Sequence, residues 1–215
     1  MTERLSKYRQ QFLDEWFGFN GVGMFIIICL IYIALLFVKR IFIIDTIAAF
    51  EILNERGDIW VFDLIYSVQY LSVPIFLGWK WTWTTLTLWI GSFMFGYRLH
   101  FNQLWKMVML SEVVFFLPEI TKVIWYSLFY SDPTYQDYQA FYPFSLLTLF
   151  DYTKISPQWI YPLKALNLFE LLYWPVLIVG IYFLSGKKLR IAAYIVLTTY
   201  ILFFLVWLLF YAMVY

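Results

Sequence analysis

Long runs of apolar residues, broken by few charges, constrain the fold of this chain more than any other feature. Of its 215 residues, 63% are hydrophobic and only 13% are charged. A soluble domain has about a quarter charged residues, and half that proportion cannot cover a globular surface. The surplus apolar surface has to face lipid. The sequence therefore predicts an all-α, polytopic transmembrane helix bundle.

The apolar runs predict five spans, with six as the alternative, since about 20 residues cross the hydrocarbon core as a helix. The predicted spans are 23–38, 81–97, 104–130, 161–186 and 191–215. The first is slightly short unless it continues into "IFII". A further run, 61–79, contains Asp63 and Pro74, and only Lys80 separates it from the next run. It forms either half of a tight helical hairpin or a shallow, re-entrant segment. We prefer five spans because the run 61–79, with Asp63 and Pro74, is a weak candidate for a span.

The remaining segments predict one transmembrane domain, residues 23–215, preceded by an amphipathic segment, residues 1–22. In 1–22 the apolar residues recur at helical spacing, which predicts a helix lying on the membrane surface. The polar connection "DTIAAFEILNERGDIW" predicts an interfacial helix and a turn at Gly57. In the loop 131–158, the run "FYPFSLLTLF" predicts another interfacial helix.

The positions of Lys and Arg in the loops predict the orientation of the bundle. With either five or six spans, the connection from Arg98 to Lys106 and the "GKKLR" turn are cytoplasmic, and the C-terminus is extracytoplasmic. Basic residues ahead of an uncleaved first span favour a cytoplasmic N-terminus and hence five spans. The sequence shows neither a transit peptide nor a retention signal. We therefore expect the cytoplasmic (inner) membrane of a bacterium.

Five charged residues fall inside or beside the predicted spans and form the candidate intramembrane polar cluster. They are Glu112, Glu119, Lys122, Lys164 and Glu170. Charge within a membrane is costly and indicates function by default. Glu112 and Glu119 are seven residues apart and so share a helix face, while Lys122 is within ion-pair reach of Glu119. Lys164 and Glu170 are six apart, so they do not both face one partner well.

Two interpretations of these charges stay open. In the structural one, Glu119 and Lys122 neutralise each other. Glu112 then pairs with Lys106, with Lys164, or with a Tyr or Trp donor. In the functional one, the glutamates form an acidic relay for protons or a coupling cation. The nearby basic residues favour the structural interpretation.

The sequence has no motif of an enzyme or of a metal or cofactor site. The single histidine, His100, and the single cysteine, Cys29, exclude H-E-x-x-H and the usual zinc, haem and iron–sulfur ligand sets. No G-x-S-x-G nucleophile elbow is present. The net charge of +1 gives no reason to expect nucleic acid. We expect a protein that is not an enzyme and has no cofactor. Its expected partners are the lipid bilayer and either another membrane protein or further copies of itself.

The C-terminal half resembles a known family in its pattern of spans. One span opens with "LNLFELLYW", runs through "LIVGI" and ends at "GKKLR" before a last apolar span. Upstream, "GYRLHFNQLWKMVMLSEVVFFLP" is a short polar connection that leads into a span. This layout is similar to the YIP family of Ypt/Rab-interacting-type integral membrane proteins. The resemblance covers roughly residues 81–215 and includes Phe169, Trp174, Gly180 and Lys187–Lys188.

The resemblance implies five spans, a cytoplasmic N-terminus and an extracytoplasmic C-terminus, in agreement with the loop charges. Eukaryotic members bind Rab GTPases and have a long soluble N-terminal tail, which is shortened here to residues 1–22. The chain therefore looks more like the prokaryotic members, and Rab binding does not carry over. The expected function is a YIP-like membrane scaffold or assembly partner. The alternative is a small permease, or a membrane subunit of a transporter, that uses Glu112 and Glu119.

Overall fold

The structure, a computed structural model, is all-α, as the sequence predicts. It describes residues 18, 20–45, 47, 60–129, 134–186 and 188–215. The predicted amphipathic segment lies outside these residues except for its last few, and the predicted interfacial helix with its turn at Gly57 lies outside them except for Asp45, Ile47 and Trp60. In chain order the elements are α2 (Gly21–Lys39), η1 (Arg40–Ile44), α4 (Trp60–Met94), α5 (Phe101–Ser111), η2 (Glu112–Phe115), α6 (Phe116–Phe129), α7 (Tyr135–Ala140), η3 (Leu146–Leu149), η4 (Tyr152–Lys154), α8 (Pro157–Ala165), α9 (Leu168–Ser185), α10 (Leu189–Val196), η5 (Leu197–Ile201) and α11 (Leu202–Val214).

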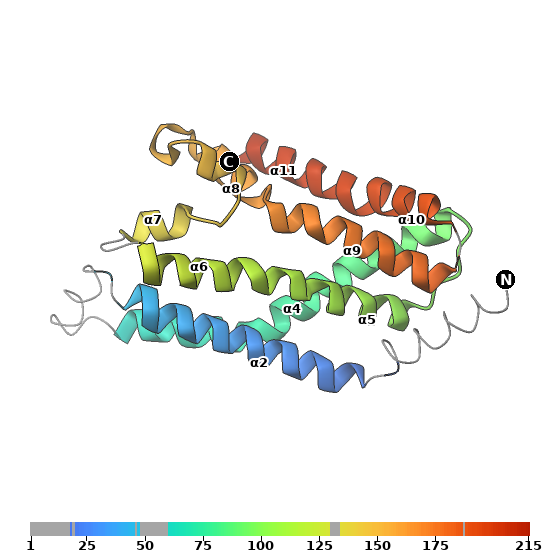
Figure 1. Ribbon diagram of the computed structural model, residues 1–215, viewed down its shortest axis with the longest axis horizontal. Helices are drawn as coiled ribbons and strands as arrows, with labels where there is room; N and C mark the ends of the chain where they lie inside the picture. Colours follow the sequence, from blue (N-terminus) through green and yellow to red (C-terminus); the bar gives the residue numbers. More distant parts are fainter. Residues whose placement is uncertain (1–17, 19, 46, 48–59, 130–133, 187) are drawn as a thin grey trace.

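In the described part of the chain, consecutive elements join into five long rods: α2–η1, α4, α5–η2–α6, α9 and α10–η5–α11. The rods alternate in direction, and α4 crosses behind the others (Figure 1). The connections after α4 and after α9 lie at one end of the bundle, together with the start of α2. At the other end lie α7, α8 and the C-terminus (Figure 1).

Helices in four of these rods are long and apolar enough to cross a membrane, in line with the prediction of a multi-pass membrane protein. They are Gly21–Ile44, Trp60–Met94, Leu168–Ser185 and Leu189–Val214. The first shows that the predicted span 23–38 does continue into "IFII". The rod α5–η2–α6 is not among them. It is broken by η2 and contains Glu112, Glu119 and Lys122.

Helix α4 corrects the prediction for residues 61–97. The structure has neither a hairpin nor a re-entrant segment there, because Trp60–Met94 is one continuous helix of 35 residues. This removes the two separate crossings that six spans require. A single proline such as Pro74 is tolerated within a membrane helix, where neighbouring groups satisfy the freed carbonyl. At 1.5 Å per residue, α4 is about 52 Å long.

The predicted span 161–186 is also divided. Helix α8 ends at Ala165, and α9 begins at Leu168. Between them Leu166 and Asn167 are extended, and the Asn167 side chain accepts a hydrogen bond from the amide of Glu170, capping α9. The predicted interfacial helix in "FYPFSLLTLF" is a short 3₁₀ turn, η3, rather than a full helix.

The core lies where α4, α5, α9 and α10 meet. Helix α9 contributes a fully buried row, Tyr173, Leu177 and Ile181, at helical spacing, and α4 contributes Trp81 and Leu88. These large side chains fill the centre of the bundle, and the remaining faces of the rods carry exposed apolar residues that suit a lipid environment.

Candidate functional site

A buried polar network in the middle of the bundle joins α4, η2 and α9. Glu112 is only 5% exposed. One of its carboxylate oxygens accepts a hydrogen bond from the ammonium of Lys80 at 2.7 Å, and the other accepts one from the hydroxyl of Tyr173 at 3.1 Å. The Lys80 ammonium also lies 4.2 Å from the centre of the Phe115 ring, a cation–π contact. Three segments that are far apart in the sequence are thus held together by one carboxylate.

A second buried carboxylate, Glu170, extends this network to η5. One of its oxygens accepts hydrogen bonds from the Tyr200 hydroxyl at 2.9 Å and from the indole N–H of Trp174 at 3.1 Å. The Tyr173 and Tyr200 rings meet edge to face, with centroids 5.4 Å apart. This ring contact connects the Glu112 and Glu170 halves of the network.

Two irregular helical stretches supply residues to this network. Glu112 is the first residue of the 3₁₀ segment η2, and Tyr200 lies in the π-helical segment η5. Pro118 accounts for the first, because its ring would clash with the carbonyl of Val114 in a regular α-helix. Mid-helix 3₁₀ turns and π-bulges are frequent at functional sites and hinges.

Two ion pairs lie between α2–η1 and its neighbours, nearer the end of the bundle that carries α7. Lys39 pairs with Glu119 of α6, and Arg40 pairs with Asp63 of α4. The side chains of Lys39 and Glu119 are both largely buried. These contacts tie the last turns of the first rod to two other rods.

Lys122 and Lys164 bind backbone carbonyls at that same end. The ammonium of Lys122 donates to the carbonyls of Tyr138 and Phe141, at 2.6 and 3.0 Å. It also lies 3.8 Å from the centre of the Tyr138 ring. Lys164 donates to the carbonyl of Gln139, and burial lowers the pKa of this lysine. Both lysines thus hold α7 and the residue after it against the bundle.

The structure divides the predicted polar cluster into two groups. Glu112 and Glu170 belong to the central network, whereas Glu119, Lys122 and Lys164 lie nearer the end of the bundle. Glu119 and Lys122 take partners other than each other. Glu112 and Glu119 do not share one helix face as predicted, because the 3₁₀ segment η2 lies between them. A 3₁₀ helix turns about 20° more per residue than an α-helix, which adds about 80° over η2.

Of the partners predicted for Glu112, which were Lys106, Lys164, or a Tyr or Trp donor, the structure shows a tyrosine, Tyr173; its ion-pair partner, Lys80, was not among them. The sequence pattern predicts Lys80 between two helices, where a lysine needs no partner. Read as part of one continuous span, Lys80 becomes an intramembrane charge that requires an acidic neighbour. The other missed cation, Lys39, lies at the end of the first predicted run, where only the fold shows that it meets Glu119.

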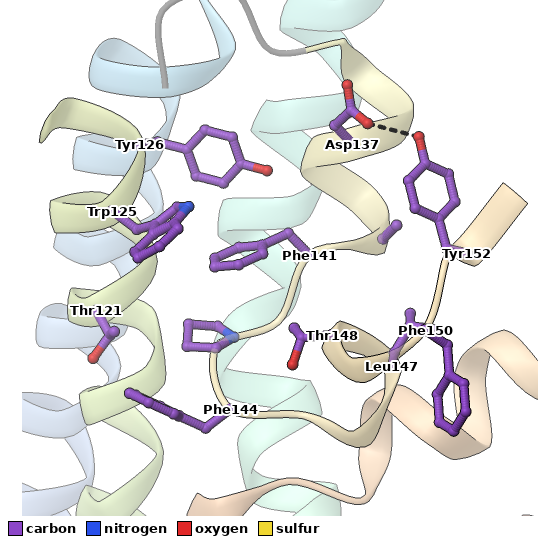
Figure 2. A pocket seen from close by; sticks show the side chains of 12 residues that line it. Thr121, Trp125, Tyr126, Asp137, Phe141, Phe144, Leu147, Thr148, Phe150 and Tyr152 are labelled. Atoms are coloured by element: carbon purple, nitrogen blue, oxygen red, sulfur yellow. Dashed lines mark hydrogen bonds between the residues drawn. The ribbon is translucent and has the colours of Figure 1, made fainter. Parts of the chain in front are cut away.

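A pocket of about 490 Å³ lies where α6 meets the connection between α7 and α8 (Figure 2). Its aromatic lining consists of Trp125, Tyr126, Phe141, Phe144, Phe150 and Tyr152. Figure 2 shows Asp137 and Tyr152 at one end, joined by a hydrogen bond, and Phe144 at the other end, near Thr121. This volume falls in the range of small-molecule sites, about 300–1,000 Å³.

Asp137 is the charged residue among the described side chains that line this pocket. It forms a capping box with Thr134 at the start of α7, and its other oxygen accepts from the Tyr152 hydroxyl at 2.6 Å. The hydrogen bonds from Thr134 and Tyr152 hold the pKa of Asp137 below its ordinary value. The carboxylate is therefore ionised at neutral pH.

Phe144, at the other end of the pocket, has a positive φ of 54°. Bulky side chains rarely occupy this left-handed region, and the conformation costs roughly 1–2 kcal/mol. Backbone hydrogen bonds on either side hold it in place: Leu168 donates to the carbonyl of Phe144, and Leu146 donates to that of Leu166. Strain of this kind is concentrated at binding sites.

The chain matches no family model, no curated protein and no solved structure.

Proposed function

We propose that this multi-pass membrane protein has five spans and acts, without catalysis, as a YIP-like scaffold or assembly partner for other membrane proteins. The observation that carries the proposal is that each of the five candidate charges is bonded within the chain. Glu112 and Glu119 each meet a lysine from another rod, and Glu170 meets two neutral donors. Such bonds hold helices together at about 0.6–2 kcal/mol each.

The arrangement of the rods supports five spans. The α5–η2–α6 rod runs beside the four clearly apolar ones, and its charges find partners inside the bundle rather than facing lipid (Figure 1). With five crossings, the start of α2 shares one end of the bundle with Arg98 and Lys188. Because basic loops stay inside, that end is cytoplasmic and the C-terminus is extracytoplasmic.

Tagged purification in a mild detergent, with mass spectrometry of co-purifying proteins, tests the scaffold proposal. A stoichiometric membrane-protein partner is expected. Glu112→Gln should keep that partner, because glutamine still accepts the Tyr173 hydrogen bond and Lys80 is partly exposed. Purification as a homo-oligomer without another protein would contradict the proposal.

A second candidate function is a small permease or a membrane subunit of a transporter. The observation that favours it is that two irregular stretches within rods, η2 and η5, supply the central network through Glu112 and Tyr200. Interrupted helices at mid-membrane are typical of transporter sites. Under this candidate, proton or cation flux into liposomes falls strongly in Glu112→Gln. Equal flux in liposomes with and without the protein would exclude it for the ions tested.

A further inference from the structure

The pocket at the end of α6 combines aromatic walls with a single ionised group. Among the described residues that line it, none carries a positive charge. The lysines nearby are engaged elsewhere: Lys122 and Lys164 bind backbone carbonyls, and Lys154 pairs with Asp151. A cavity with aromatic faces and one carboxylate is complementary to an organic cation, which gains both cation–π and ion-pair contacts.

The polarity of the pocket is graded along the axis of α6. Asp137 and Tyr152 lie at its outer end, near the level of Tyr126, and Phe144 lies at its inner end, beside Thr121 (Figure 2). On the elements that line the pocket, further apolar side chains are widely exposed, namely Leu128 and Phe129 of α6 and Leu149 of η3. The charged end is thus farther from the middle of the bundle than the apolar end. A phospholipid in a bilayer has the same order of polarity, with its polar headgroup at the surface and its acyl chains toward the middle.

We propose that this pocket binds the ammonium headgroup of a membrane phospholipid, with the ammonium at Asp137 and the first part of an acyl chain along Phe144. A primary ammonium, as in phosphatidylethanolamine, donates to the carboxylate and lies against the rings of the outer end. The pocket volume of about 490 Å³ accommodates a headgroup with a short length of chain. The proposal does not depend on the scaffold function and requires only that the protein is inserted in a membrane.

Native mass spectrometry of the purified full-length protein tests this proposal. The protein is equilibrated with equal amounts of phosphatidylethanolamine and phosphatidylglycerol that have identical acyl chains. The wild type should retain phosphatidylethanolamine in preference. In Asp137→Asn this preference should fall about tenfold, the effect of losing one charge-assisted contact. Asparagine keeps an acceptor for the capping box, so α7 should still form.

Asp151→Asn is the matched control. Asp151 lies in the same connection and also caps a turn, accepting from the amide of Thr153, but it does not line the pocket. Its substitution should leave the lipid preference unchanged. The proposal is overturned if the wild type shows no preference or prefers phosphatidylglycerol, or if both asparagine variants lose the preference equally.

A second variant keeps the proposal testable if Asp137→Asn does not fold. Ala140 lines the pocket with the smallest side chain there. Ala140→Phe should fill the pocket and lower retention of phosphatidylethanolamine while the carboxylate stays in place. If a folded Ala140→Phe protein retains as much phosphatidylethanolamine as the wild type, the lipid binds outside the pocket and the proposal is wrong.

Discussion

At the scale of single residues, Gly91 shows how closely α4 and η5 approach. A Cβ on Gly91 would lie 2.2 Å from Cγ2 of Thr199. Thr199 cannot move aside easily, because its χ1 is restricted and its hydroxyl donates to the carbonyl of Ile195. We expect Gly91→Ala to lower the free energy of unfolding in detergent by about 1–3 kcal/mol.

Two further variants check this expectation for Gly91. Gly78→Ala on the same helix is the control, since its Cβ would meet Phe25 at an ordinary 3.8 Å. Adding Thr199→Ser to Gly91→Ala removes Cγ2 but keeps the hydroxyl, so it should restore most of the stability. A Gly91→Ala protein as stable as Gly78→Ala would show that the two rods separate readily.

The pair formed by Lys80 and Glu112 gives a second residue-scale prediction. Lys80→Met removes the cation of a buried carboxylate and should lower the unfolding free energy by up to about 3–5 kcal/mol. Because the Lys80 side chain is 35% exposed, water that reaches the carboxylate reduces this loss. The double variant Lys80→Met with Glu112→Gln has no buried charge left there and should be more stable than Lys80→Met alone. Additive losses in a detergent-unfolding cycle would indicate that the pair is not coupled.

At the scale of elements, Lys122 fixes α7 to the end of α6. Lys122→Met leaves the carbonyls of Tyr138 and Phe141 without their donor, at a cost of about 1–3 kcal/mol. Amide hydrogen exchange should therefore increase over residues 134–152 and stay unchanged in α9. Lys154→Met is the control, because the Lys154 side chain is 82% exposed and its surface ion pair contributes little.

The capping box of α7 makes its stability depend on pH in a defined direction. Because the pKa of Asp137 is lower in the folded protein, its ionised form stabilises α7 above the ordinary value of 3.8, and that contribution is lost as the pH falls through the folded pKa. Exchange of the α7 amides should be insensitive to Asp137 between pH 7 and about 5 and should rise below about 4. In Asp137→Asn, a rise of the same size at the same pH would refute this origin.

Sequence patterns predict some of these elements and not others, for physical reasons. The last apolar run, 191–215, exceeds the length of a membrane span, and the first does so once "IFII" is included, so hydropathy identifies both. The sequence divides α4 at Lys80 because a charged residue is typical of the end of a span, whereas in the structure Lys80 lies within the helix and donates to Glu112. The partners of Glu119 and Lys122 come from other elements, so spacing along one helix cannot reveal them.

At the scale of the whole molecule, the antiparallel rods predict on which side of the membrane each connection lies. Cys29 is the single cysteine, so a Cys29→Ser background allows one new thiol at a time. An impermeant maleimide should label Asp151→Cys in intact cells and Arg98→Cys only after permeabilisation. Both positions are exposed. Labelling of both in intact cells, or of Arg98→Cys alone, would contradict five spans with the C-terminus outside.

The length of α4 determines which bilayer thickness matches this protein best. A rod of about 52 Å exceeds the hydrocarbon thickness of about 30 Å, and tilt alone does not absorb the excess. Its first turns carry Asp63, Ser67 and Gln69, which can lie among lipid headgroups. A thick membrane covers more of the apolar remainder than a thin one. A thicker bilayer is therefore the better match for the hydrophobic length of this helix.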